Sequence, residues 1–410
     1  MRVFHCRVRP GTDVEAGRPA QTRRTMGQSS RPPGSGGLRV LIAGGGVAGL
    51  ETMLALRELA GNLVEVELLS PEHHFWYRPL AVGEPFDTAE VQRFELQAIA
   101  GAVGATFTPA AIGIVDPVHS RVLTSHGAEL TYDVLVVACG TRSLPALDGA
   151  VTFRGPSDVD RLRTLLEEID AGAAKRIAFA LPRHAGWPLP LYELALQTAI
   201  HVEDRRIYGI ELSLVTHERA PLAMLGAAAS DAVSHLLHER RIALHAGRYP
   251  LSFRDGRLTL VPDETIAADR VVALARLVGQ PIPGIPQDRD GFVAVDRTGR
   301  VEGLDDVYAV GDIRRSPIKQ GGIAAQQGAH VAEAIAARAG ADVAQQPLEP
   351  VLHALLLTGR EPLYLRTELS AAKERATEAT AEPLFWPPAK ISSRYLAPFL
   401  ASQERALTRA

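Results

Sequence analysis

The sequence has few cysteines, little net charge and no long apolar run. Its two cysteines, Cys6 and Cys139, are far apart and have no histidine cluster beside them. This spacing excludes a disulfide framework and a cysteine-based zinc site, and it favours a reducing, cytoplasmic setting. The formal net charge of -3 provides no basic field to hold nucleic acid. No apolar stretch reaches the roughly eighteen residues that span a bilayer, so no transmembrane helix is expected.

Metal ligands and a secretory signal are also missing. The histidines have no acidic or cysteine partners at ligand spacing, so no metal site is predicted. Residues 1–37 are rich in Arg, Gly, Pro, Ser and Thr and lack the apolar core of a signal peptide. We expect this segment to be a disordered tail, with Met26 as an alternative start.

The rest of the chain has the composition of a globular protein with more than one domain. Hydrophobic residues make up 46% and charged residues 22% of its 410 residues, a length that exceeds one ordinary core. A buried strand is expected at Leu38–Ala43, followed by glycines, a helix that ends at Gly61 and a second strand at Val64–Leu69. This arrangement is a βαβ unit, which builds parallel sheets.

Strands and helices alternate through two similar halves of the chain. Further strands are expected at Tyr132–Ala138, Arg176–Leu181, Glu211–Thr216, Arg270–Leu274 and Val307–Val310. Helices are expected at Val159–Ile169, Leu191–His201, Ala228–Arg240 and Ala324–Arg338. Beyond Gly340, we expect strands at Leu352–Leu357 and Leu363–Arg366 and a loop or helix at Thr367–Glu382.

These patterns predict an α/β fold with two Rossmann-like dinucleotide-binding domains and a small C-terminal α+β domain. The segment from Arg176 to Gly284 repeats the layout of the first half, and we expect it to be inserted into that half. The predicted boundaries are 1–37 for the tail, 38–155 with 288–342 for the first domain, 156–287 for the second and 343–410 for the C-terminal domain.

A glycine fingerprint, GGGVAG, follows the first strand and opens the first helix. Gly44 permits the tight turn, Gly46 lets the backbone approach a pyrophosphate, and Gly49 lets the helix pack on the strand. The first helical residues, Val47 and Ala48, offer unpaired N–H groups and the positive end of the helix dipole to phosphates. The strand–turn–helix context predicts a bound dinucleotide.

The position that normally holds the dinucleotide ribose departs from the usual pattern. An acidic residue is expected about 20 residues after the fingerprint, where it binds the ribose hydroxyls. The strand ends there at Ser70, and Glu72 is the nearby acid that reaches the ribose instead. Both residues are therefore predicted to lie beside the cofactor.

Two further segments match the motifs of a known superfamily. Ala138–Thr141 follows a predicted strand, and Val307–Asp312 has the sequence VYAVGD. Together with the glycine fingerprint, they resemble in type and order the motifs of the FAD-dependent pyridine nucleotide–disulfide oxidoreductase superfamily, over about Leu38 to Phe399. The resemblance implies that the Asp312 carboxylate accepts hydrogen bonds from the ribityl chain of FAD. The FAD-binding residues that it implies in these segments are Cys139, Gly140, Thr141, Gly311 and Asp312.

Within that superfamily, the chain resembles type II NADH dehydrogenases and sulfide:quinone oxidoreductases. The similar segments are Phe75–Pro85, Pro317–Gly328, Leu352–Leu365 and Trp386–Leu400. The resemblance places Arg78 and Pro79 near the flavin. It also implies catalytic roles for Lys319 and Gln320, because a cation and a helix start near the ring stabilise reduced flavin. Gln326 or Gln327 matches one of the two glutamines expected at a quinone site, and Gly322 takes the place of the other.

Two departures limit what the resemblance implies. No cysteine pair is left for a redox disulfide or for sulfide chemistry, and Cys139 is expected to be a small buried filler. The first turn of the second domain, Pro182–Pro190, contains one glycine and Trp187, which restricts close contact with a pyrophosphate. At the end of the next strand, Glu218 suits a ribose and Arg219 suits a 2′-phosphate, with ordinary surface charge as the alternative.

The sequence therefore predicts an FAD-dependent oxidoreductase that passes electrons from NAD(P)H to a quinone or a small electron acceptor. Two alternatives stay open: an FAD enzyme with a degenerate nicotinamide site that oxidises another small substrate, such as a sulfur compound, and a non-catalytic FAD-bound sensor. Small-molecule donors and acceptors are the predicted partners, without nucleic acid. The apolar stretch Tyr395–Leu400 is expected to contact a membrane or a second copy, or to pack on its own domain. The predicted location is cytoplasmic, with peripheral association at the inner face of the membrane left open.

Overall fold

The computed structural model describes residues 36–183, 185–369 and 376–409. The predicted tail lies outside these ranges except for its last two residues, and so does His184 of the second domain's first turn. By their contacts, residues Gly37–Ala410 form one compact unit. None of the described helices is long and apolar enough to cross a membrane.

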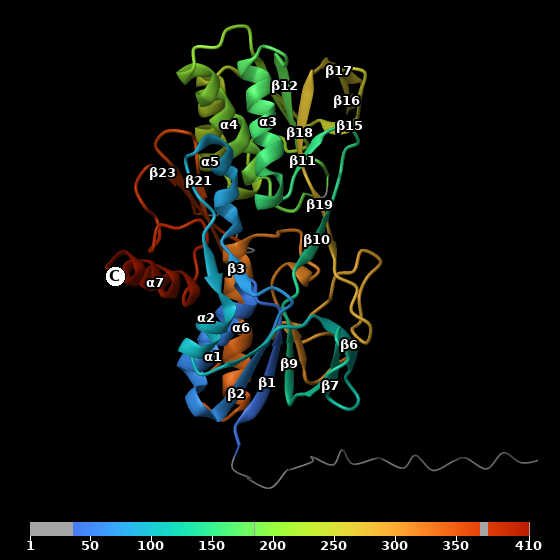
Figure 1. Cartoon of the computed structure of the whole chain (residues 1–410), viewed down its shortest axis with the longest axis vertical. Coiled ribbons are helices and arrows are strands. Elements are labelled where there is room, and N and C mark those ends of the chain that lie inside the picture. The colour runs from blue at the N-terminus through green and yellow to red at the C-terminus, as the bar shows by residue number, and fades with distance from the viewer. Residues whose placement is uncertain (1–35, 184, 370–375, 410) are drawn as a thin grey trace, which may run out of the picture. The chain divides into compact units, whose positions relative to one another are not determined.

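A five-stranded parallel sheet, called the first sheet here, is the centre of the first half (Figure 1). The strand order is β20-β9-β1-β2-β5, and each neighbouring pair is parallel. Its strands are β1 (Leu38–Ala43), β2 (Val64–Leu69), β5 (Thr106–Thr108), β9 (Val134–Val137) and β20 (Val307–Ala309). The inner strands β1 and β9 are almost entirely apolar and buried, as expected when both faces of a parallel sheet are covered.

Alternate side chains of β1 enter two different cores. Val40 and Ile42 pack with apolar residues of the two helices that cover one face, while Leu41 and Ala43 join the core on the other face. The helices are α1 (Val47–Ala60) and α6 (Gly321–Arg338). The opposite core includes residues of an antiparallel sheet formed by β6 (Ile112–Asp116), β7 (Arg121–Thr124) and β8 (Glu129–Thr131). The first sheet therefore lies between a helical layer and a small sheet.

The second half repeats this layout around a second five-stranded parallel sheet of order β11-β18-β12-β13-β14. The strands of this second sheet are β11 (Val151–Phe153), β12 (Arg176–Ala180), β13 (Glu211–Thr216), β14 (Ile242–Ala246) and β18 (Arg270–Leu274). Its helices are α3 (Val159–Asp170), α4 (Leu189–Asp204) and α5 (Ala227–Glu239), and its antiparallel sheet is β15 (Tyr249–Arg254), β16 (Arg257–Val261) and β17 (Glu264–Ala267). The predicted α/β class with two Rossmann-like sheets is confirmed.

Short antiparallel strand pairs connect these parts. The pair β10 (Thr141–Leu144) and β19 (Arg276–Gly279) runs between the two halves (Figure 1). The pair β3 (His74–Trp76) and β4 (Arg93–Glu95) leads to α2 (Leu96–Ala102). Strand β11 pairs with the second sheet although it precedes the predicted boundary at residue 155. The division into three domains stays a prediction.

The C-terminal segment forms an antiparallel sheet of β21 (Val351–Leu356), β22 (Leu363–Glu368) and β23 (Thr377–Thr380), and then α7 (Leu396–Arg409). The prediction of a loop or helix at Thr367–Glu382 is wrong where the structure describes it, because β23 pairs with β22. The two threonines of β23 are β-branched and suit a strand, which outweighs the low-complexity Ala/Glu/Thr composition.

A buried carboxylate fixes the start of α7. The Glu51 side chain of α1 is 0% exposed. Its Oε1 accepts hydrogen bonds from the N–H groups of Arg394 (2.9 Å) and Tyr395 (3.0 Å), and its Oε2 accepts one from Leu396 (2.7 Å). Burial raises the pKa of Glu51, while the three N–H groups oppose this shift. A negative charge at a helix N-terminus is favourable, so Glu51 anchors the C-terminal helix to the first half.

Replacing Glu51 by alanine should destabilise the fold and release α7. The change leaves N–H groups at the start of α7 without an acceptor, which costs about 1–3 kcal/mol of unfolding free energy. Urea unfolding measures the loss, and amide exchange measures protection at Leu396. The matched control is Glu58→Ala, because Glu58 is an exposed residue of the same helix. Equal stability of the two variants would contradict the anchoring role.

Candidate functional site

Four loops with predicted cofactor contacts meet at one edge of the first sheet. They follow β1, β2, β9 and β20, which are adjacent and parallel, so their carboxyl ends lie together. Backbone hydrogen bonds link the strand ends: Gly44 N donates to Leu69 O, Ala138 N to Ala43 O, and Val310 N to Val137 O. The structure thus brings together the glycine turn, Ser70, the Cys139–Thr141 segment and the Gly311–Asp312 segment.

The three fingerprint glycines have different surroundings. A Cβ at Gly44, where φ is +129°, would lie 2.2 Å from Ala138 O, and one at Gly49 would lie 1.9 Å from Gly44 O. A Cβ at Gly46 would meet nothing within 4 Å. No side chain caps the start of α1, so the N–H groups of its first residues, Val47 and Ala48, remain available to an anion. Gly44 and Gly49 therefore serve packing, and Gly46 faces the space that a ligand needs.

The loops after β2 and β9 contribute polar and small groups. Ser70 is buried and its Oγ accepts a hydrogen bond of 3.3 Å from Glu72 N, while the Glu72 side chain is exposed. Cys139 donates from Sγ to Ala43 O at 3.3 Å, and burial raises the pKa of its thiol to about 12. A thiol with such a pKa is a poor nucleophile, in accord with its predicted role as a filler. Gly140 adopts a φ of +66° before β10 begins at Thr141.

The Asp312 carboxylate is the acidic group of this edge. It is partly buried, and burial raises its pKa to about 6 against the opposing charge of Lys319. In the described part of the chain, no group donates a hydrogen bond to its side-chain oxygens, so a ligand hydroxyl can supply one. The preceding residue, Gly311, has a φ of +75° and donates its N–H to Gln327 Oε1 at 2.9 Å. Gln327 therefore holds the loop that carries Asp312.

The two residues predicted as catalytic have internal partners. Lys319 donates from Nζ to Asp312 O at 2.9 Å and to Arg314 O, and its ammonium lies 4.0 Å from the centroid of the Phe292 ring. Burial lowers the pKa of Lys319 to about 8. Gln320 caps α6, because its Oε1 accepts from Ile323 N at 2.8 Å. Both side chains thus shape the loop and the helix start, and their catalytic roles stay a proposal.

Gln326, the residue before Gln327 in α6, also has a structural role. Gln326 binds Val351 of β21 in both directions, donating to its oxygen at 2.8 Å and accepting from its N–H at 2.9 Å. Gln326 thereby connects α6 to the C-terminal sheet, and the structure does not bring it together with the residues of the first-sheet edge.

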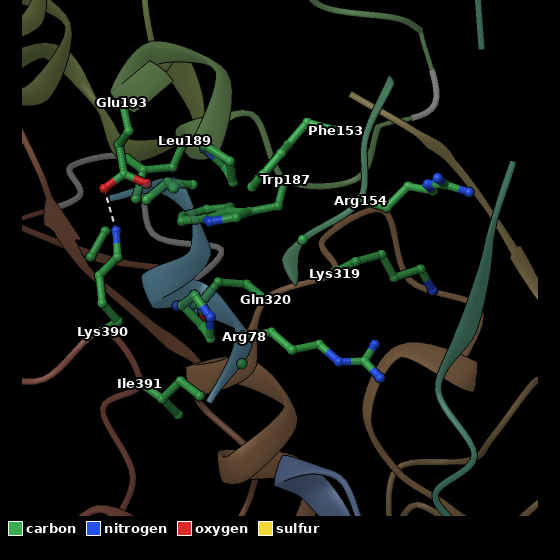
Figure 2. A pocket seen from close by; sticks show the side chains of 16 residues that line it. Arg78, Phe153, Arg154, Trp187, Leu189, Glu193, Lys319, Gln320, Lys390 and Ile391 are labelled. Carbon is green, nitrogen blue, oxygen red and sulfur yellow. Dashed lines mark hydrogen bonds and ion pairs between the residues drawn. The ribbon is translucent and has the colours of Figure 1, made fainter. Parts of the chain in front are cut away.

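A cavity of about 250 Å³ lies where the two halves and the C-terminal segment meet. Figure 2 shows its lining side chains converging from segments that are far apart in the sequence. Residues of the cavity wall include Arg78 and Pro79 after β3, Trp187 and Glu193 around the start of α4, Lys319 and Gln320 before α6, and Lys390 and Ile391 before α7. Four residues predicted near the flavin thus line one cavity that reaches the N-terminus of α6.

One wall of the cavity holds a buried ion pair that sequence reasoning missed. Lys390 binds the Glu193 carboxylate and also donates to Leu355 O at 2.9 Å, while Leu357 N donates to Glu193 Oε1 at 2.8 Å. The two side chains are 4% and 1% exposed. Burial raises the pKa of Glu193 and lowers the pKa of Lys390, and the contact between them opposes both shifts. The pair joins α4, β21 and the segment before α7.

At the edge of the second sheet, the acidic residue predicted to bind a ribose already has internal hydrogen-bond partners. Glu218, the predicted ribose ligand, accepts hydrogen bonds from Tyr192 Oη at 2.7 Å and from Thr216 Oγ1 at 3.1 Å. Burial raises the pKa of Glu218, which these donors oppose. Arg219 is exposed. Glu218 therefore already has two internal donors at the place where a ribose would compete for it.

Among the described residues, no group of three or more His, Cys, Asp and Glu side chains is placed to hold a metal ion. The uncapped N–H groups at the start of α1 suit the phosphates of an organic cofactor.

Comparisons with known proteins agree with this architecture. Residues 193–330 match the family model for pyridine nucleotide-disulphide oxidoreductases. An NADH dehydrogenase-like protein of Mycobacterium tuberculosis is 28% identical over 305 residues, which cover 67% of this chain and 72% of that protein. The sulfide-quinone reductase of Aquifex aeolicus is 26% identical over 189 residues, covering 44% of this chain and 43% of that protein.

Solved structures share the fold. The sulfide:quinone oxidoreductase of Aquifex aeolicus aligns with a TM-score of 0.74 at 17% identity and covers 84% of this chain and 87% of its own. NDH2 from Plasmodium falciparum, in complex with NADH, aligns with a TM-score of 0.64 at 12% identity and covers 90% and 94%. The predicted resemblance to the pyridine nucleotide–disulfide oxidoreductases is thereby confirmed in sequence and in fold.

Removing one partner of the buried ion pair should cost much stability. Lys390→Met leaves the Glu193 carboxylate without its cation, and an uncompensated buried charge costs about 3–5 kcal/mol. The double variant Glu193→Met with Lys390→Met has no buried charge and should recover a large part of the loss. Urea unfolding of the wild type, both single variants and the double variant measures the coupling. Additive losses would show that the two side chains do not act as a pair.

Proposed function

We propose that this chain is an FAD-dependent oxidoreductase that passes electrons from NAD(P)H to a quinone or another small electron acceptor. The observation that carries the proposal is the convergence of the glycine turn, Ser70, Gly140 and Asp312 on one edge of the first sheet. Loops at the carboxyl ends of parallel strands are the usual binding place for dinucleotides. The sequence similarity to oxidoreductases that include an NADH dehydrogenase-like protein supports the same reaction class.

The cofactor is assigned to groups of complementary chemistry. The open backbone at Gly46 and the uncapped start of α1 suit the pyrophosphate, and the Asp312 carboxylate suits the hydroxyls of the ribityl chain. Ser70 and Glu72 suit the ribose, the Cys139–Thr141 segment is one of the loops at this edge, and Arg78 lines the cavity together with Lys319 and Gln320. FAD, when bound, supplies the ability to take two electrons from a donor and release them to an acceptor.

The start of α6 contributes electrostatics to this site. Its N-terminus carries the positive end of the helix dipole, and the side chain of Gln320 fixes its first turn. Lys319 holds the carbonyl groups of Asp312 and Arg314, which keeps the loop between Asp312 and α6 in place. A positive potential at this position favours an electron-rich ring system, so these residues stabilise the reduced cofactor.

Reduction of a quinone also consumes protons. Glu193 and Lys390 are titratable groups in the cavity wall, and in their ion pair the proton lies on Lys390, whose pKa is lowered by burial. We propose that this pair supplies a proton to the acceptor from the Lys390 ammonium, with Glu193 holding that ammonium in place.

In a second candidate function, no nicotinamide binds, and a small substrate reaches the cofactor directly. It is favoured by the turn between β12 and α4, which carries Trp187 and two prolines where a dinucleotide requires close backbone contact.

Under either candidate, we propose a cytoplasmic enzyme. A contact of the C-terminal region with the inner face of a membrane or with a second copy also stays a proposal. Leu396 and Leu400 are buried in the first half's core and are not free for such a contact.

Valine at Gly46 should block FAD without disturbing the fold. A Cβ there meets no protein atom within 4 Å. The valine side chain projects into the space assigned to the pyrophosphate, and the steric conflict of about 1–3 kcal/mol lowers the affinity for FAD by roughly tenfold to a hundredfold. Fluorescence titration of the apoprotein with FAD measures the affinity, and thermal unfolding of the apoprotein should be nearly unchanged.

The matched control is Gly101→Val in α2, where a Cβ also meets nothing within 4 Å. This variant should bind FAD like the wild type. If both valine variants bind FAD equally well, the pyrophosphate does not lie at Gly46.

Anaerobic reduction of the FAD-loaded protein distinguishes the two candidates. The first candidate expects NADH or NADPH to bleach the flavin absorbance faster than sulfide does, and a quinone to restore it. Stopped-flow absorbance records both steps. Bleaching by sulfide alone would overturn the first candidate in favour of the second, and bleaching by neither donor would contradict both sulfide and nicotinamide as reductants.

A further inference from the structure

A tyrosine hydroxyl connects the loop after β3 to the segment before α7. Tyr77 Oη accepts a hydrogen bond of 2.8 Å from Ile391 N. Both residues are buried, with exposed fractions of 6% for Tyr77 and 2% for Ile391. Because a buried backbone N–H group requires an acceptor, the path of the chain at Ile391 depends on this hydroxyl.

The core of the first half fixes the position of Tyr77. Its backbone N–H donates to Gln92 O at 2.9 Å, and its ring meets that of Phe75 edge-on, with the two centroids 6.4 Å apart. Both rings belong to the apolar cluster on the helical face of the first sheet. The hydroxyl therefore has a defined position from which it holds Ile391.

Ile391 in turn packs closely on the start of α6. A Cβ at Gly321 would lie 3.0 Å from Ile391 Cγ1, so the isoleucine contacts the helix where glycine leaves space. Three residues further on, the Glu51 carboxylate binds the N–H group of Arg394. The segment before α7 is thus held at two points, and Tyr77 provides the one at the cavity wall.

Lys390 directly precedes the residue that Tyr77 holds. Its side chain is 4% exposed and reaches the Glu193 carboxylate in the cavity wall (Figure 2). Tyr77 itself does not line the cavity, so it acts there through the backbone of Ile391. Fixing the backbone one residue away restricts where the ammonium can lie, and a displacement of about 1 Å near a reacting group costs up to roughly a hundredfold in rate.

We propose that Tyr77 is a positioning residue for protonation of the acceptor, because its hydroxyl holds Ile391 and thereby keeps the Lys390 ammonium at the cavity wall. This inference rests on the proposed function. A quinone takes up two electrons and two protons. Two electrons and one proton come from the hydride that NAD(P)H gives to FAD, and the Lys390 ammonium supplies the second proton, which the amine regains from solvent.

The first test separates the two half-reactions of the FAD-loaded protein. Tyr77→Phe keeps the ring and removes the hydroxyl. Stopped-flow absorbance should show reduction by NADH or NADPH at nearly the wild-type rate, and reoxidation by a water-soluble benzoquinone slower by about tenfold to a hundredfold. Reoxidation by ferricyanide, which takes up an electron and no proton, should keep the wild-type rate. Equal slowing with both acceptors would overturn the role in protonation.

The matched control is Tyr364→Phe. Tyr364 is a buried residue of β22 that does not line the cavity. Loss of its hydroxyl should leave both half-reactions unchanged. A comparable slowing with the benzoquinone in this variant would mean that loss of any buried tyrosine hydroxyl has the effect, which overturns the specific role of Tyr77.

The second test needs no turnover. Amide hydrogen exchange of the apoprotein reports the protection of the Ile391 N–H group. Tyr77→Phe should raise its exchange rate by about tenfold, because the hydrogen bond is lost, and Tyr364→Phe should leave it unchanged. Unaltered exchange at Ile391 in Tyr77→Phe would show that the hydroxyl does not hold the chain.

A variant without the ion pair tests the path through Lys390. In the double variant Glu193→Met with Lys390→Met, the proton donor is absent and its partner charge is removed with it. Adding Tyr77→Phe to this background should slow reoxidation by the benzoquinone no further. A further loss of about tenfold or more would show that Tyr77 acts independently of Lys390, which overturns the inference.

The outcomes separate this inference from the proposed function. If the benzoquinone reoxidises Tyr77→Phe as fast as the wild type, the positioning role is overturned and the quinone stands as acceptor. If it reoxidises neither protein after NAD(P)H has reduced them, the quinone is overturned and the inference with it. If Tyr77→Phe is slowed with the benzoquinone and not with ferricyanide, both are supported.

Discussion

The close contact between α1 and the turn before it is the constraint on which the site depends. A Cβ at Gly49 would lie 1.9 Å from Gly44 O, and a Cβ at Gly44 would lie 2.2 Å from Ala138 O. Only glycine at both positions lets the helix start so close to the sheet. The uncapped N-terminus of α1 consequently lies beside the loops that follow β9 and β20, where Asp312 is found. The packing of α1 on the sheet and the position of its uncapped N-terminus are therefore consequences of the same two glycines.

Two buried carboxylates, at equivalent positions of the two halves, hold the C-terminal segment that forms one wall of the cavity. Glu51 lies in α1, which follows β1 in the first half. Glu193 lies in α4, which follows β12 in the second half. Glu51 accepts the first N–H groups of α7, and Glu193 binds Lys390 and Leu357 N. Each half thus uses an acidic residue to hold the same segment, which supplies one wall of the cavity. A carboxylate buried with several donors is stable only when the segment is docked, so the cavity and the C-terminal fold depend on each other.

Local sequence was sufficient for the parts of the site that a single loop determines. The glycine turn and the Val307–Asp312 segment each follow a strand, and their chemistry depends on residues within a few positions. The Glu193–Lys390 pair could not be predicted in this way, because its members are 197 positions apart and meet only in the tertiary structure.

The residues before α6 show the same limit. Sequence reasoning placed Lys319 and Gln320 near the start of α6, where they lie, but it could not find the carbonyl partners of Lys319, which depend on the path of the loop. The helix cap by Gln320 was also missed, because glutamine is not among the residues usually preferred at that position. The composition of Thr367–Glu382 does not predict β23, because its low complexity is typical of a loop while the two threonines of the strand are β-branched.

We propose that the adenylate and pyrophosphate of FAD lie at the loops that follow β1 and β2 and that its ribityl chain lies at Asp312. The most direct test is to compare the affinities of the apoprotein for FAD and for FMN, which lacks the adenylate half, by isothermal titration calorimetry. FAD should bind at least about a hundredfold more tightly, since FMN offers a single phosphate to the anion site at the start of α1 and has no ribose for the contacts at Ser70 and Glu72. Equal affinity for FAD and FMN, or no uptake of FAD, would contradict this assignment.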